Sequence, residues 1–199
     1  MYKNAILHFK KVDPILYNLA KSQTPFVLEI APDLFTRLTR SIIGQQLSVK
    51  ASSAIYLRFE KLFKNKINPK EILDLKDDDV RKSGISYPKI KYIKDLALKT
   101  YTKKLILESL KNSSEEIVIA QLTKVKGIGT WSAEMFLMFA LGREDVFSLG
   151  DLGLKNAIKK HYKIEDINTE IMLEISKKWS PYRTYACKIL WTSLDNQPK

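Results

Sequence analysis

Apolar residues recur every three or four positions along most of this 199-residue chain, which is the period of an amphipathic helix. In the segment 34–43, one face carries Leu34, Phe35, Leu38 and Ile42. The segment 87–101 aligns Ile90, Ile93 and Ala97 in the same way. The alternating pattern of a strand is nearly absent, and 25–31 (PFVLEIA) is expected to be a short extended connector. The pattern predicts an all-α protein of roughly ten helices.

Capping residues and prolines mark where these helices begin. The predicted starts are Asp13-Pro14, Ser48, Asn68-Pro69, Ser113 (with Glu116 as a capping box) and Ser180-Pro181. Glycines at 44 and 84 mark two predicted helix ends. The proline-containing passage 25–32 and the loop 142–150 are natural borders between two helical lobes.

Charge and cysteine content restrict the class of protein. Lys and Arg number 34 against 22 Asp and Glu, a net charge of +12 that is spread along the chain. This charge indicates an anionic partner, most often nucleic acid, although a solvated Lys-rich surface is the alternative. A single cysteine, Cys187, excludes an intramolecular disulfide, a zinc finger and a four-cysteine iron–sulfur site from this chain alone. His8 and His161 have no ligand-like spacing with other donors, so no transition metal is expected.

The expected compartment follows from what the pattern lacks. We expect a cytoplasmic protein, nucleoid-associated if prokaryotic, because the sequence shows neither an apolar run of membrane-spanning length nor a signal-peptide pattern.

Gly127-Ile128-Gly129 forms the most informative local feature, a turn between two apolar helical segments. Glycine tolerates positive φ and lets a backbone approach another molecule closely. The helix that follows presents unpaired N–H groups to a phosphate, and Lys124 and Lys126 flank the turn. Such a hairpin can hold a nucleic-acid backbone without reading its sequence. By itself, the pattern also fits a plain helix hairpin with glycine as its C-cap.

Four segments together resemble the helix-hairpin-helix DNA glycosylases of the HhH-GPD superfamily, and within them the alkylpurine, or 3-methyladenine DNA glycosylase II, branch. They are FTRLTRSIIGQQLSVKASSAI, SGISYPKIKYIKDLA, LTKVKGIGTWSAEMFLMFAL…DVFSLGDLGL and WSPYRTYACKILW. In family order, they cover about Asp33 to Leu194. The resemblance implies two helical lobes, a central one over 36–147 and a second one formed by 1–35 and 148–199. The active-site cleft would lie between them.

The resemblance also implies a function. A monofunctional DNA glycosylase would flip alkylated purines of the 3-methyladenine and 7-methylguanine type out of double-stranded DNA and hydrolyse the N-glycosidic bond in base excision repair. Asp151 would be the catalytic carboxylate, with a simple N-cap as its alternative role. Asp145 would be structural. The base pocket would contain Trp131, Trp191 and Met135, with Tyr182 and Tyr185 as weaker candidates, although both tryptophans could instead be core aromatics.

Further residues are assigned on the same resemblance. The DNA contacts would be Gln45 and Gln46 in the loop that fills the gap in the base stack, together with Lys89, Lys126, Gly127, Gly129 and Thr130. The alternative for the two glutamines is helix capping. No cofactor is expected to be required, but the backbone carbonyls of Thr123, Val125 and Ile128 could bind Na⁺ or K⁺. A monomer without membrane association is expected.

Departures from the family pattern refine these expectations. Trp131 occupies the position of the Schiff-base lysine of bifunctional relatives, so no lyase step is expected. Ser148 replaces a frequent proline, which predicts a looser loop before Asp151. Met135 stands where some relatives have an aromatic residue, which predicts a softer pocket. The alternatives are a non-catalytic helix-hairpin-helix protein that senses damage and a glycosylase for oxidised or deaminated bases. Asp151 argues against the first, and Trp131 argues against the usual oxidised-guanine enzyme.

Overall fold

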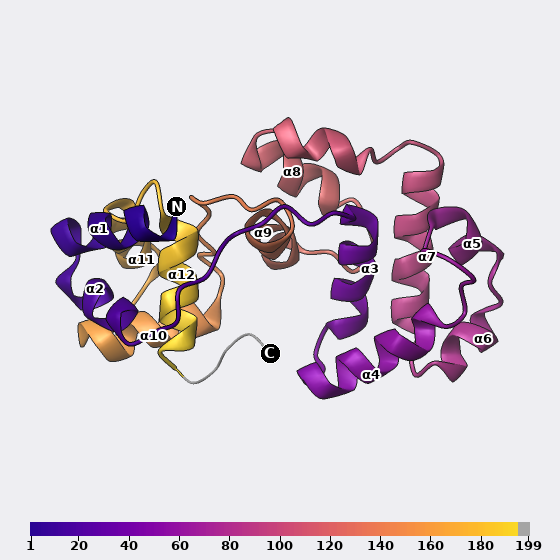
Figure 1. Ribbon diagram of the computed structural model, residues 1–199, viewed down its shortest axis with the longest axis horizontal. Helices are drawn as coiled ribbons and strands as arrows, with labels where there is room; N and C mark the ends of the chain where they lie inside the picture. Colours follow the sequence, from indigo (N-terminus) through magenta and orange to yellow (C-terminus); the bar gives the residue numbers. More distant parts are fainter. Residues whose placement is uncertain (195–199) are drawn as a thin grey trace. The chain divides into compact units, whose positions relative to one another are not determined.

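The computed structural model describes residues 1–194, which form helices joined by short loops (Figure 1). These residues contain no strand, so the all-α prediction is confirmed. The elements are α1 (Tyr2–Val12), α2 (Pro14–Lys21), α3 (Leu34–Gly44), α4 (Val49–Glu60), α5 (Pro69–Asp74), α6 (Asp77–Lys82), α7 (Tyr87–Tyr101), the 3₁₀-helix η1 (Leu107–Asn112), α8 (Glu115–Leu122), α9 (Thr130–Phe139), α10 (Leu152–Tyr162), α11 (Thr169–Lys177) and α12 (Arg183–Thr192). The segment 25–31 is irregular, as its predicted connector role requires.

The chain divides into two compact units. The central unit comprises residues 31–136, and the terminal unit comprises 1–30 and 137–199. Helix α9 begins in the central unit and ends in the terminal unit. The expected functional domains, 36–147 and 1–35 with 148–199, stay a prediction.

In the central unit, α7 is the element against which the others pack. Helices α3, α5 and α6 all contact it, and Figure 1 shows α3 on one side of α7 with α5 and α6 on the other. Its buried positions Ile90, Ile93, Leu96 and Ala97 include the three that the sequence predicted. The predicted face of α3 is buried as well. Apolar burial is the main stabilising contribution to a domain. This core therefore holds α7 in place.

In the terminal unit, α12 has the central role. It packs against α2 and α10, and seven of its ten residues are buried, among them Tyr185 and Trp191. Both chain ends therefore contribute to this core. The side chain of Asp13, between α1 and α2, is buried and accepts hydrogen bonds from Trp179 and Tyr162.

Three of the five predicted helix starts are confirmed. The predicted start at Ser180-Pro181 is wrong, because α12 begins at Arg183 with Tyr182 as its N-cap. The side chains of Asp13, Ser48 and Asn68 each accept the backbone N–H three residues on, as N-caps do. The predicted capping box at Ser113 is wrong by one residue, because Ser114 is the N-cap of α8 and accepts from the N–H of Ile117. The hydroxyl of Ser113 donates instead to the Ser109 carbonyl and ends η1.

The helical pattern missed two elements. Helix α1 begins after Met1, which makes no side-chain cap bond, and η1 follows Ile106, which makes none either. Neither start therefore carries the polar cap by which helix starts are recognised in a sequence. Among the described residues, no helix combines the length and the apolar character needed to cross a bilayer.

Candidate DNA-binding and catalytic site

The turn between α8 and α9 adopts the conformation for which its glycines were singled out. Gly127 has φ +79°, and a Cβ built there would lie 2.1 Å from the Tyr92 ring, so only glycine fits. At Gly129, a Cβ would meet nothing within 4 Å. The first glycine is thus required by the fold, and the second leaves the start of α9 open to a close neighbour such as a phosphate.

Helix α7 holds this turn through Asp95. The Asp95 carboxylate accepts the backbone N–H of Lys126 at 2.8 Å and pairs with Lys99 Nζ at 2.6 Å. Burial would raise the pKa of Asp95, but these hydrogen bonds outweigh it and hold the pKa below its ordinary value. The N–H of Lys126 is therefore committed within the protein, while the Lys126 side chain is exposed. Neither Tyr92 nor Asp95 was anticipated from sequence, although Lys89, Tyr92 and Asp95 follow one another at intervals of three residues, about one helical turn each.

The loop between α3 and α4 lies beside the same turn. Gln45 Nε2 donates to the Gly127 carbonyl at 2.8 Å. Lys89 Nζ donates to the carbonyls of Ile43 and Gln45 at 2.8 and 2.6 Å, and burial lowers the pKa of its ammonium. Gln46 is exposed and has φ +58°, a left-handed conformation that is uncommon for glutamine. A pocket of about 220 Å³ lies between this loop and Gly84, Ile85 and Ser86.

Asp151 is held from two sides in the terminal unit. As the N-cap of α10, it accepts the N–H of Leu154 on Oδ1 at 2.7 Å. The indole Nε1–H of Trp191 donates to the same oxygen at 2.8 Å. The residue is 8% exposed, and a Cβ at Gly153 would lie 3.0 Å from Oδ1, so a small residue is required beside it. The N-cap role is real, and it fixes the carboxylate in one orientation.

The predicted pocket residues have different environments. Trp131 is 46% exposed, whereas Trp191 is 3% exposed, bonded to Asp151 and packed against Phe139 at 6.1 Å. Met135 is partly exposed, as is Tyr182, whose ring contacts that of His8 edge to face. Tyr185 is fully buried, and its hydroxyl donates to Glu144. Among the predicted pocket residues, Trp131 is thus the aromatic side chain with the largest exposed fraction for stacking on a base.

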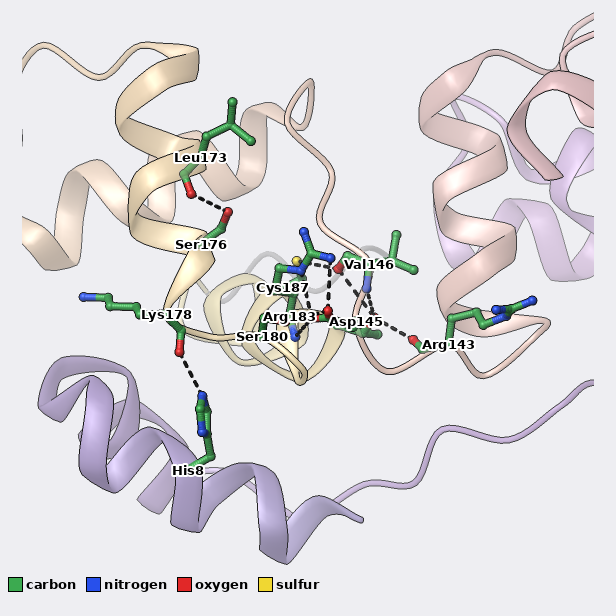
Figure 2. Close-up of polar contacts among 11 residues, drawn as sticks. His8, Arg143, Asp145, Val146, Leu173, Ser176, Lys178, Ser180, Arg183 and Cys187 are labelled. Carbon is green, nitrogen blue, oxygen red and sulfur yellow. Dashed lines mark hydrogen bonds and ion pairs between the residues drawn. The ribbon is translucent and has the colours of Figure 1, made fainter. Parts of the chain in front are cut away.

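The loop that leads to Asp151 is fastened to the start of α12 (Figure 2). Arg183 bonds Asp145 through two guanidinium nitrogens at 2.8 and 3.1 Å, and Ser180 Oγ donates to the same carboxylate. Thr184 Oγ1 donates to the Arg143 carbonyl and accepts the N–H of Val146. These contacts give Asp145 the structural role expected for it. Ser148, predicted to loosen the loop, is fully buried, and its carbonyl accepts the N–H of Asp151.

The expected monovalent-cation site falls in the hairpin. Thr123 is the C-cap of α8, and the Val125 carbonyl accepts the N–H of Ile128 at 3.1 Å within the turn. The C-terminal end of a helix is its negative end, but Val125 and Ile128 lie beyond α8, so binding of Na⁺ or K⁺ by these carbonyls stays a prediction. Elsewhere, the described residues include no group of three His, Cys, Asp or Glu side chains that could hold a metal ion.

The structure thus brings predicted residues together within each unit. Gln45, Lys89, Lys126 and the Gly127 turn are neighbours in the central unit, and Asp151 and Trp191 are neighbours in the terminal unit. A cleft shared by the two groups stays a prediction.

Comparison with known proteins identifies the family. Residues 39–181 match the HhH-GPD superfamily of base excision DNA repair proteins. The chain belongs to this superfamily. A solved structure of a DNA-3-methyladenine glycosidase from Bacillus halodurans is 36% identical, with a TM-score of 0.84, over 95% of this chain and 88% of that one. The Schizosaccharomyces pombe 3-methyladenine DNA glycosylase, solved in complex with abasic DNA, is 30% identical, with a TM-score of 0.81, over 96% of this chain and 97% of that one.

A curated sequence relative supports the same branch. The DNA-3-methyladenine glycosylase of Saccharomyces cerevisiae is 32% identical, over 96% of this chain and 79% of its own length. The resemblance seen in the four sequence motifs is therefore confirmed, both for the superfamily and for its 3-methyladenine branch.

Proposed function

We propose that this protein is a monofunctional DNA glycosylase that excises alkylated purines from double-stranded DNA in base excision repair. The observation that carries the proposal is Asp151, a buried carboxylate held by both the α10 N-terminus and the Trp191 indole. The similarity to 3-methyladenine glycosylases over nearly the whole chain supports the substrate class. The net charge of +12 suits DNA as the partner.

The chemistry asks little of the protein beyond charge and position. Alkylation at a ring nitrogen makes the purine cationic, so it departs as a neutral base when the bond to the sugar C1′ breaks. The sugar then carries positive charge, which the Asp151 carboxylate stabilises. A water molecule adds to C1′ and loses a proton, and this leaves an abasic site. No amine bonds to the sugar, because Trp131 stands where a lyase would have lysine.

Exposed groups recognise the damaged base and the DNA backbone. The base must leave the stack before the bond can break. Trp131, with Met135 beside it on α9, offers an electron-rich surface for a cationic base, an attraction of about 1–2 kcal/mol when desolvated. The hairpin and Lys126 hold the phosphates. A cation bound to the hairpin carbonyls would add positive charge there.

Base release from DNA carrying one defined lesion at a time tests the proposal. We expect release of 3-methyladenine or 7-methylguanine in the presence of a chelator of divalent metals, with no covalent adduct trapped by borohydride. DNA binding without release of any alkylated, deaminated or oxidised base would favour the non-catalytic alternative. Release of only oxidised or deaminated bases would move the protein to another substrate class.

A further inference from the structure

Gln45 and Gln46 are adjacent in sequence, but only Gln45 bonds the hairpin turn. Gln45 reaches across to the hairpin, 82 residues further along the chain, and donates from Nε2 to the Gly127 carbonyl at 2.8 Å. Because the partner is a carbonyl oxygen, the amide nitrogen must face it. Gln46 is exposed, with its backbone in the left-handed region at φ +58°. The half-buried Gln45 bonds the hairpin at the protein surface, whereas the exposed Gln46 is presented to the surroundings.

Lys89 fastens the same loop from α7. Its ammonium donates to the Gln45 carbonyl at 2.6 Å and to the Ile43 carbonyl, in the last turn of α3, at 2.8 Å. A cation at the negative end of a helix is a favourable placement. Gln45 is therefore held at both its carbonyl and its side chain. The bonds run from α7 through the loop to the hairpin.

Helix α7 also holds the hairpin end of this connection. Tyr92 of α7 lies against Gly127 so closely that no Cβ could be added, and Asp95 of the same helix holds the N–H of Lys126. Lys89, Tyr92 and Asp95 lie at successive turns of α7. Helix α7 thus sets the position of both the hairpin turn and the loop that carries Gln46.

We propose that Gln45 is a positioning residue, which ties the α3–α4 loop to the hairpin turn, and that Gln46 alone is presented to the DNA stack. This inference rests on the proposed function in one respect, that the protein opens a gap in duplex DNA. Anchoring the backbone contact and the gap-filling side chain to one helix fixes the distance between the phosphate that is held and the gap that is filled. Lys89 acts with Gln45 in this positioning and not as a phosphate ligand.

A double-mutant cycle tests the assignment without any catalytic step. The measured quantity is the preference for a duplex with a stable abasic analogue over the same duplex intact. Gln45→Met keeps the side-chain length but removes the donor, and Gln46→Ala removes the presented side chain. We expect each to lower the preference roughly three- to ten-fold, the effect of one hydrogen bond. The double variant should lose little more, because Gln45 acts through Gln46.

Any of three outcomes would overturn the assignment. The first is that the two substitutions lower the preference additively. The others are an unchanged preference in Gln45→Met and a wild-type protein with no preference for the abasic analogue. Thermal unfolding of each variant controls for loss of fold. Base release by the wild type is scored separately. If the wild type releases the base but the losses from the two substitutions are additive, only this inference is refuted. If the losses are not additive but the wild type releases no base, only the proposed function is refuted.

The salt dependence of DNA affinity distinguishes the role of Lys89 from that of Lys126. Lys126→Met should reduce the slope of log affinity against log salt by about one, as the loss of one phosphate contact does. Lys89→Met should leave that slope unchanged and lower the preference for the abasic analogue, as Gln45→Met does. An equal loss of slope in both variants would show that Lys89 binds phosphate.

Discussion

Two places in the terminal unit each combine a helix-capping aspartate with a tryptophan, and we call them the Asp13 corner and the Asp151 corner. Asp13 caps α2 and accepts the indole N–H of Trp179 at 2.7 Å, and Asp151 caps α10 and accepts the indole N–H of Trp191 at 2.8 Å. Both carboxylates are nearly buried, at 1% and 8% exposure. A capping aspartate bonded to a tryptophan is therefore not in itself an active site.

The corners differ in how the carboxylate is used. At Asp13, Oδ1 accepts the N–H of Leu16, while Oδ2 accepts Tyr162, Trp179 and the ammonium of Lys178. Its charge is balanced inside the protein. At Asp151, the cap bond and the indole bond both fall on Oδ1. This arrangement fixes the direction of the carboxylate, which is what electrostatic stabilisation of a cationic sugar requires.

We expect the largest effect, a loss of single-turnover base release, for Asp151→Asn. The amide oxygen can replace Oδ1 and keep the hydrogen bonds from Leu154 and Trp191, so the loss in the free energy of unfolding should be under about 1 kcal/mol. The negative charge is lost, and single-turnover base release should fall roughly a hundred- to a thousand-fold. Binding of undamaged DNA should persist. Nearly unchanged release by a folded variant would reduce Asp151 to a helix cap.

Asp13→Asn should show the reverse pattern. Asn cannot serve donors on both oxygens, because its amide NH₂ must face either Leu16 N–H or the three donors on the other side. We expect a loss of roughly 2–3 kcal/mol in the free energy of unfolding, measured by denaturant titration. The rate of base release per folded molecule should not change. A rate loss like that of Asp151→Asn would contradict the distinction between the two corners.

A smaller effect is expected from the matched substitutions of Trp191 and Trp179. Trp191→Phe and Trp179→Phe each remove an indole donor from a buried site, so both should cost stability. Only Trp191→Phe should also lower single-turnover release, by about ten-fold, because Asp151 loses a bond that orients it. If the two variants lose rate equally after correction for the folded fraction, the Trp191–Asp151 bond has no catalytic role.

The smallest expected effect is a dependence of stability on pH. Burial would raise the pKa of Asp13, but bonds from Tyr162, Trp179 and Lys178 outweigh it and lower the pKa below its ordinary value. A lowered folded-state pKa gives stability that is present above about pH 4, the unfolded value, and is lost as the pH falls through the folded value. The stability difference between wild type and Asp13→Asn should therefore be constant above about pH 5 and narrow below pH 4. A difference that widens in acid would contradict this assignment.

The helices and the local caps could be predicted because they depend on nearby residues. The buried face of α7, the caps at Asp13 and Asn68 and the positive φ of Gly127 all follow from spacing and residue type. Asp151 and the hairpin were found through family motifs. The contacts that position them could not be read in this way, because they join residues far apart in sequence. The Gln45–Gly127 and Trp191–Asp151 bonds are examples.

The central claim is that the Asp151 carboxylate serves a positively charged sugar, and binding of two abasic-site analogues tests it most directly. One duplex carries a cationic pyrrolidine in place of the sugar, and the other carries the neutral tetrahydrofuran. Because an enzyme binds a mimic of its transition state more tightly than a neutral analogue, the wild type should prefer the cationic duplex by at least about ten-fold. That ratio should fall close to one in Asp151→Asn and persist in Asp13→Asn. A ratio that survives in Asp151→Asn would contradict the claim.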